Sequence, residues 1–125
     1  MAALIPEQIQ GAIFLAGRSE ALLADEAGYG KTAQAILAAD LTVSQTILVL
    51  TTSSARINWL REFDMWSPNN RPAFAAMTTT CEIPRKADVV VVGWGNFLSA
   101  GIWRQLQARR WDALIAMLSR RGWDP

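Results

Sequence analysis

The chain has 125 residues, of which 51% are hydrophobic and 18% charged, which is enough apolar material for one small packed domain. Twelve Lys and Arg stand against eleven Asp and Glu, so the formal charge of +1 at pH 7 excludes a bulk polycation or an acidic tail. The lack of histidine and the single Cys81 exclude a zinc site of the usual kind and an internal disulfide.

The N-terminal residues predict neither a signal peptide nor a membrane anchor. Residues 1–5 carry no Lys or Arg, and Pro6 and Glu7 interrupt the apolar stretch. No window approaches the roughly eighteen continuous apolar residues that a membrane span needs. We therefore expect a cytoplasmic protein with no membrane partner.

The first third of the chain predicts a helix, a strand and a second helix. Residues 6–16 are expected to be helical, with Pro6 in the first turn, where its missing N–H costs little. Residues 20–24 form a short apolar run that reads as a strand. A glycine-containing loop follows, and residues 32–39 are rich in strong helix formers.

The middle of the chain predicts a buried strand and an amphipathic helix. Residues 46–51 are β-branched and continuously hydrophobic, which is typical of a strand covered on both faces. Residues 55–66 return to helical spacing. Ile57, Leu60 and Phe63 are expected to lie along one buried stripe of that helix.

The rest of the chain repeats the alternation. Residues 73–77 predict a weak strand and residues 88–92 a strong one, followed by a helix over 97–109 and a strand beginning at 111–115. Strands that alternate with helices and are apolar throughout favour a mostly parallel sheet in an α/β domain. No repeat, linker or low-complexity tract divides the chain.

Residues 116–125 do not continue this pattern. From residue 101 onward the chain has five Arg and two Asp, a charge of +3, whereas residues 1–100 carry −2. A solvated arginine-rich face explains this asymmetry, and a patch that contacts phosphates is the alternative. We expect residues 1–115 to form the domain and residues 116–125 to be an atypical tail.

The loop between the first strand and its helix has the composition of a phosphate-binding site. It reads Gly28-Tyr29-Gly30-Lys31-Thr32. The glycines allow backbone N–H groups to turn toward an anion, the following helix N-terminus adds positive potential, and Lys31 supplies charge for the β and γ phosphates. Thr32 would offer its hydroxyl to Mg²⁺. The alternative is a glycine-rich turn whose lysine is merely solvated.

One departure from the standard loop points to a particular family. The standard pattern has a glycine five positions before Gly30, where this chain has Asp25. The stretch resembles motif I of the Swi/Snf-type ATPases of helicase superfamily two, D-E-x-G-x-G-K-T. The residues that carry this resemblance are Asp25, Glu26, Ala27, Gly28, Tyr29, Gly30, Lys31 and Thr32.

Three more stretches resemble the same family in order and spacing. Residues 4–8 look like its upstream glutamine element, residues 47–66 like motif Ia with its helix, and residues 88–94 like motif Ib. The resemblance, which covers residues 4–115, implies a partial RecA-like P-loop lobe that binds ATP with Mg²⁺. It also implies that Gln8 hydrogen-bonds the adenine and that double-stranded DNA is the track.

In the resembled family, the turns after the motif Ia and Ib strands face the nucleic-acid backbone. This implies that Ser54, Gly93 and Trp94 lie near DNA phosphates. Thr52 departs from the family pattern, because a proline is usual at that position. For Trp94 the alternative is an aromatic side chain packed at the edge of the sheet.

For the other tryptophans, the sequence favours packing in the core over stacking on nucleic-acid bases. Trp59 and Trp66 are seven residues apart, on one face of a helix, and are expected in the core. Trp103, Trp111 and Trp123 lie among arginines, a composition that is compatible with stacking on bases, but their spacing does not demand it.

The groups that hydrolyse ATP are missing from the sequence. Phosphoryl transfer to water needs a carboxylate that holds the metal, a group that orients water, and positive charge for the γ-phosphate. In the resembled family, a D-E-x-H motif after a strand similar to residues 111–115 supplies the first two, and a second lobe supplies the arginines. Here Ala116-Met117-Leu118 follows Ile115, and Asp112 lies at the wrong end of the strand.

We therefore expect no catalytic residues and a truncated lobe that binds ATP without hydrolysing it by itself. One alternative is a stand-alone nucleotide-binding regulatory module. The other is a non-enzymatic remnant or protein-interaction fragment, whose unpaired strand edges would favour self-association.

Overall fold

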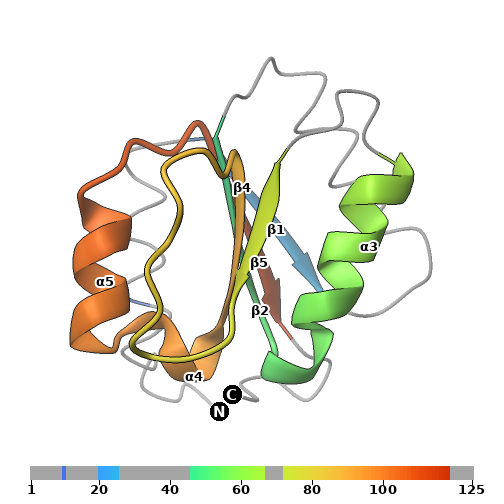
Figure 1. The fold of residues 1–125 in the computed structure, drawn as a ribbon. Helices are drawn as coiled ribbons and strands as arrows, with labels where there is room; N and C mark the ends of the chain where they lie inside the picture. Colours follow the sequence, from blue (N-terminus) through green and yellow to red (C-terminus); the bar gives the residue numbers. More distant parts are fainter. Residues whose placement is uncertain (1–9, 11–19, 26–45, 67–71, 119–125) are drawn as a thin grey trace, which may run out of the picture.

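In the described part of the chain, five parallel strands form the central sheet, and helices cover both of its faces (Figure 1). The computed structural model describes residues 10, 20–25, 46–66 and 72–118. Within these residues the strand order is β1-β5-β2-β4-β3, and every neighbouring pair is parallel. The α3 helix lies on one side of the sheet, and α4 and α5 lie on the other. The predicted α/β class, a partial RecA-like lobe with a parallel sheet, is confirmed.

The elements follow the predicted order closely. The strands are β1 (Glu20–Asp25), β2 (Ile47–Thr51), β3 (Ala73–Ala76), β4 (Val89–Gly93) and β5 (Ala113–Leu118). The helices are a 3-10 turn η1 (Ser53–Ala55), α3 (Arg56–Trp66), α4 (Trp94–Phe97) and α5 (Ala100–Gln107). Gln10 is helical, and the rest of the helix expected over 6–16 and the helix expected over 32–39 lie outside the described residues.

Two neighbouring inner strands of the described sheet, β2 and β4, are buried along their whole length. Alternate residues of a strand point to opposite faces, so an apolar run can fill two cores at once. Leu48 and Leu50 pack in the cluster that contains Phe97 of α4, whereas Ile47 and Val49 pack in the other cluster. This double burial confirms the prediction that residues 46–51 form a strand covered on both faces.

Helix α3 covers its face of the sheet with two aromatic side chains. Trp59 and Phe63, one helical turn apart, are buried, with ring centroids 6.1 Å apart. The expected stripe is wrong at Ile57, which is 45% exposed. At 3.6 residues per turn, side chains two residues apart in the sequence are separated by about 200° around the helix axis. Ile57 therefore points away from the side of the helix that buries Trp59. The side chain of Trp66 is outside the described part of the structure.

The helix expected over 97–109 is two helices. Phe97 ends α4, and α5 begins only at Ala100. Ser99 has an extended backbone (φ −61°, ψ 144°), and its carbonyl accepts from the N–H of Trp103 at 2.8 Å. Its hydroxyl donates to the carbonyl of Asn96 at 2.8 Å, which ties the start of α5 to α4. The side chain of Ser99 does not cap α5, so the division into two helices comes from its extended backbone and from the bond back to Asn96.

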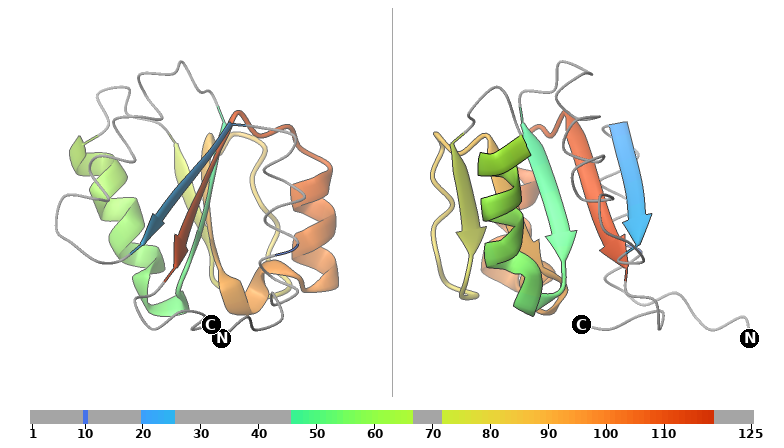
Figure 2. Two further views of the ribbon diagram at one scale, coloured as in Figure 1. Left: turned by 180° about the vertical axis from the view of Figure 1, so that it is seen from behind. Right: turned by 90° about the vertical axis from the view of Figure 1, so that its right-hand side faces the viewer.

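Strand β5 lies inside the described sheet, between β1 and β2 (Figure 2). It runs to Leu118, so residues 116–118 belong to a strand, and the boundary expected at residue 115 stays a prediction. Trp111, just before it, is buried and donates its Nε1–H to the carbonyl of Leu106 at 2.8 Å. The Arg109 guanidinium lies 4.9 Å from the centroid of the Trp111 ring. This packing favours a core role for Trp111 over stacking on bases.

None of the helices in the described segments combines the length and the apolar character that crossing a bilayer requires. The expected cytoplasmic location stays a prediction.

Candidate functional site

The carboxyl ends of the strands lie along one edge of the sheet, because all the described pairs are parallel. Ligands of open parallel sheets bind beyond this edge. Asp25 is the last residue of β1 and is paired in register with Leu118 of β5. The predicted phosphate loop therefore starts at this edge. Gln8 and the residues of the loop itself, 26–32, lie outside the described residues.

The strand beside β1 carries no carboxylate. All six residues of β5, Ala113–Leu118, are apolar, and the nearest preceding acid is Asp112. Asp112 lies before the first residue of β5, at the opposite end from Asp25, and its Oδ2 accepts from the N–H of Thr46 at 3.2 Å. The prediction that Asp112 stands at the wrong end of its strand is confirmed. The described residues contain no cluster of three or more potential acidic or thiol metal ligands.

The turn after β2 presents hydroxyl groups at the carboxyl edge. Ser53 and Ser54 are exposed, and the Thr52 and Ser54 hydroxyls lie 3.5 Å apart. Arg56, in the first turn of α3, binds this turn to the next strand of the chain. Its Nε donates to the carbonyl of Ser53 at 3.0 Å, and its Nη1 donates to the carbonyl of Ala76, the last residue of β3, at 2.8 Å.

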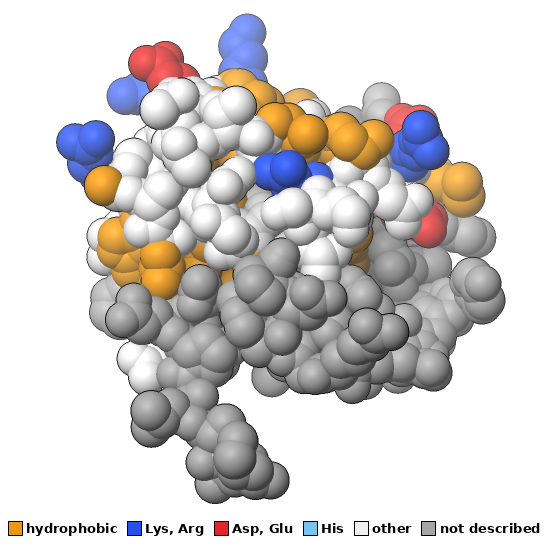
Figure 3. All heavy atoms as spheres, turned by 90° about the horizontal axis from the view of Figure 1, so that it is seen from below, with side chains coloured by type: hydrophobic (Ala, Val, Ile, Leu, Met, Phe, Trp, Pro, Cys, Tyr) orange, Lys and Arg blue, Asp and Glu red, His pale blue; other side chains and the backbone are white. Residues whose placement is uncertain are grey.

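Gly93, at the end of β4, provides the space into which this turn fits. A Cβ added at Gly93 would lie 2.9 Å from the Ser53 hydroxyl oxygen and 3.3 Å from the Ser53 Cα. Both separations are shorter than ordinary van der Waals contact, so a side chain here would displace the turn. The structure thus places Ser53 against Gly93 and places Ser54 on the same turn. Figure 3 views the molecule from this side.

Trp94 follows Gly93 but points into the protein. Its side chain is 1% exposed, and its ring meets Phe97 edge to face, with centroids 5.9 Å apart. Phe97 in turn meets Trp103 edge to face at 5.4 Å. This burial favours the alternative given for Trp94, a packed aromatic side chain, over a contact with DNA. An indole with so little exposed area offers no surface on which a nucleic acid could stack.

Thr51, the last residue of β2, has a fully buried hydroxyl with no hydrogen-bond partner among the described residues. A buried hydroxyl without a partner costs about 1–3 kcal/mol. We expect Thr51→Val, which replaces the hydroxyl by a methyl group of similar size, to raise the free energy of unfolding by about 1 kcal/mol. Urea denaturation of the full chain measures this change.

Thr46, directly before the first residue of β2, provides the matched control near the other end of this strand. Its hydroxyl donates to the carbonyl of Arg110 at 2.8 Å and accepts from the N–H of Asp112 at 3.1 Å. Thr46→Val should therefore lower the free energy of unfolding by about 1 kcal/mol, a change of opposite sign. Equal effects from the two substitutions would contradict this account of Thr51.

The structure also shows functional candidates that the sequence alone did not indicate. Arg56 was not singled out in the sequence, because its two carbonyl partners lie three and twenty residues away. The contact between Gly93 and Ser53 joins residues forty positions apart. The one local signal was the pair of glycines, Gly93 and Gly95, directly after an apolar strand.

Comparison with known proteins identifies relatives of this chain. The chain is 36% identical over 89 residues to the SWI/SNF-related matrix-associated actin-dependent regulator of chromatin subfamily A-like protein 1 of Xenopus tropicalis, and 40% identical over 74 residues to the Bos taurus protein of that name. It is 37% identical over 71 residues to the DNA annealing helicase and endonuclease ZRANB3 of Mus musculus. The chain is related to the Swi/Snf-type helicase-like proteins.

The similarity covers 70%, 58% and 55% of this chain, respectively. It covers only 9%, 8% and 7% of the three relatives, so the chain corresponds to a small part of each. No protein-family model matches the chain. The resemblance stated from the motifs is confirmed by these relatives, and the roles of individual residues stay predictions.

Proposed function

We propose that this chain is the ATP-binding part of a Swi/Snf-type, DNA-dependent ATPase lobe, the kind found in helicases and DNA translocases. The observation that carries the proposal is the place of β1 in the parallel sheet. The strand ends with Asp25 at the carboxyl edge, and the sequence continues directly into Gly28-Tyr29-Gly30-Lys31-Thr32. In the proposal, residues 25–32 surround the triphosphate, and Gln8 contacts the adenine.

The residues fit the phosphates of ATP better than they fit its magnesium ion. Gly28 and Gly30 would allow backbone N–H groups to approach the phosphates, and Lys31 would neutralise their charge. Thr32 would supply a hydroxyl ligand to Mg²⁺, but the neighbouring strand β5 is apolar throughout and adds no carboxylate. Bound Mg²⁺ would supply charge neutralisation at the phosphates. We therefore propose that the chain binds Mg-ATP and does not hydrolyse it by itself at a useful rate.

The same edge of the sheet is the proposed DNA-facing side. Ser54 is exposed on the turn after β2, and Gly93 brings the end of β4 next to that turn. Hydroxyl and backbone N–H groups are typical phosphate contacts that position a nucleic acid without reading its sequence. In this proposal Ser54 contacts the DNA, whereas Gly93, which is buried, makes room for the turn, and Trp94 supports it from the core. The mouse relative is named a DNA annealing helicase and endonuclease, which supports DNA as the partner.

Thermal unfolding of the purified full chain in the presence of Mg-ATP tests the proposal. A ligand that binds only the folded state stabilises it in proportion to RT ln(1 + [L]/Kd), about 2.7 kcal/mol at one hundred times Kd. We expect a concentration-dependent rise in Tm that is lost in Lys31→Ala. Lys86→Ala is the matched control, because Lys86 is the only other lysine in the chain and is exposed on the β3–β4 connection.

Two results would contradict this proposal. Equal stabilisation of the wild type and of Lys31→Ala by Mg-ATP would show that the predicted phosphate loop does not bind the nucleotide. Phosphate release above the level of Lys31→Ala, and stimulated by double-stranded DNA, would overturn the absence of hydrolysis.

A further inference from the structure

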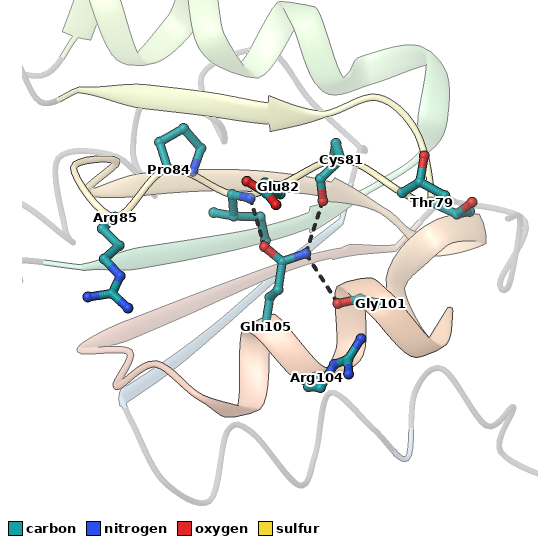
Figure 4. Close-up of a pocket in the computed structure, with 10 residues that line it drawn as sticks. Thr79, Cys81, Glu82, Pro84, Arg85, Gly101, Arg104 and Gln105 are labelled. Atoms are coloured by element: carbon teal, nitrogen blue, oxygen red, sulfur yellow. Dashed lines mark hydrogen bonds between the residues drawn. The ribbon is translucent and has the colours of Figure 1, made fainter.

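A groove of about 800 Å³ lies between the β3–β4 connection and α5 (Figure 4). Residues 79–85 form one wall, and Gly101, Arg104 and Gln105 of α5 form the other. Its volume falls within the range of ligand sites, roughly 300–1,000 Å³. None of the residues assigned to the carboxyl edge lines this groove.

The side chain of Gln105 holds the two walls together. Its Oε1 accepts from the N–H of Ile83 at 2.7 Å, and its Nε2 donates to the carbonyls of Cys81 at 3.0 Å and Gly101 at 3.2 Å. A Cβ at Gly101 would lie 3.3 Å from the carbonyl oxygen of Thr79, so the glycine allows the helix to approach the connection closely. The groove is thus shaped before any ligand arrives, which lowers the entropic cost of binding.

Arg109 holds the far end of the same connection. Its Nη1 donates to the carbonyl of Pro84 at 3.2 Å and its Nη2 to the carbonyl of Ala87 at 2.6 Å. Its guanidinium also packs on Trp111. The guanidinium of Arg109 is therefore used in contacts that position the wall. A ligand would have to pair with other cationic side chains of the groove.

Those cations are Arg85 and Arg104, one from each wall. Both are exposed, and neither side chain has an ion-pair partner in the described part of the chain. Figure 4 shows them on either side of Gln105. Glu82 is the only acidic residue among those that line the groove, and Lys86 next to Arg85 adds a further positive charge. Guanidinium groups bind carboxylates through two parallel hydrogen bonds.

We propose that this groove binds an acidic peptide segment of a partner protein, with carboxylates paired to Arg85 and Arg104. The two guanidinium groups are separated by Gln105, which suits acidic side chains spaced along a peptide. Pro84, which is exposed in the wall, provides apolar contact for the rest of the segment.

Fluorescence anisotropy with the full chain tests the proposal. The probe is a labelled peptide of eight alternating Glu and Ala residues, and a Lys-Ala peptide of the same length is the probe control. The groove variant is Arg85→Glu/Arg104→Glu. The matched variant Arg61→Glu/Arg110→Glu changes the net charge equally at exposed residues that do not line the groove.

We expect the Glu-Ala peptide to bind the wild type and the matched variant with equal affinity. Its affinity for the groove variant should be about tenfold lower, and its binding to the wild type should weaken with added salt. Equal losses in both variants would overturn the proposal, since only net charge would then matter. Binding of the Lys-Ala peptide as tight as that of the Glu-Ala peptide, or no binding of either, would also overturn it. So would a groove variant that loses duplex DNA binding and keeps peptide binding.

Discussion

Trp94→Ala is expected to lower the free energy of unfolding by about 3–5 kcal/mol, the usual cost of removing a large buried aromatic. The side chain is 1% exposed and packs in the cluster formed by α4, α5 and the sheet. Because small domains are stable by only about 5–15 kcal/mol, this loss is a large share of the total. Urea denaturation followed by circular dichroism measures it.

Two controls separate core packing from surface effects. Trp94→Phe keeps part of the ring volume and should cost clearly less than Trp94→Ala. Ile57→Ala on α3 removes an apolar side chain that is 45% exposed and should change stability by no more than about 0.5 kcal/mol. A Trp94→Ala chain as stable as the wild type would show that the indole is not a core residue.

Gly93→Ala is expected to lower the free energy of unfolding by about 1–3 kcal/mol, the cost of overpacking a close contact. The added methyl would lie 2.9 Å from the Ser53 hydroxyl oxygen and 3.3 Å from its Cα. Because Arg56 binds the carbonyls of Ser53 and Ala76, the turn cannot shift without disturbing β3 as well. Thermal or urea unfolding measures this loss.

Two substitutions make the test of Gly93 specific. Gly95→Ala adds a methyl that would lie 3.9 Å from the same hydroxyl, an ordinary contact, on an exposed position of α4. Alanine favours helix over glycine, so this variant should be unchanged or more stable by up to about 1 kcal/mol. Ser53→Ala removes the nearest atom and should recover part of the loss in the Gly93→Ala background. Failure of Ser53→Ala to recover any stability would place the strain elsewhere.

These two predictions concern the support of the proposed DNA-facing edge. Trp94 anchors the segment after β4 in the core, while Gly93 leaves room for the turn that carries Ser53 and Ser54. Neither residue needs to touch DNA to affect its binding. A loss of DNA binding in either variant therefore has to be compared with its loss of stability before a contact is assigned.

Several features of the fold and site were predictable because they depend on neighbouring residues. Local periodicity predicts the buried strands β2 and β4 and the helix over residues 55–66. It also predicts that Trp59 is buried. The absence of a carboxylate in β5 is a property of the sequence itself. The order of the motifs along the chain also indicates the Swi/Snf-type family, to which the relatives belong.

Other features required the tertiary structure, because they join residues that are far apart in the chain. Strand pairing inserts β5 between β1 and β2, although it is the last described strand in sequence. The same pairing brings Gly93 against Ser53, and the packing of α5 on residues 79–85 forms the groove closed by Gln105. Periodicity indicates which face of a helix or strand is apolar. The free energy of burying that face against a particular partner depends on the whole sheet, so only the tertiary structure decides these contacts.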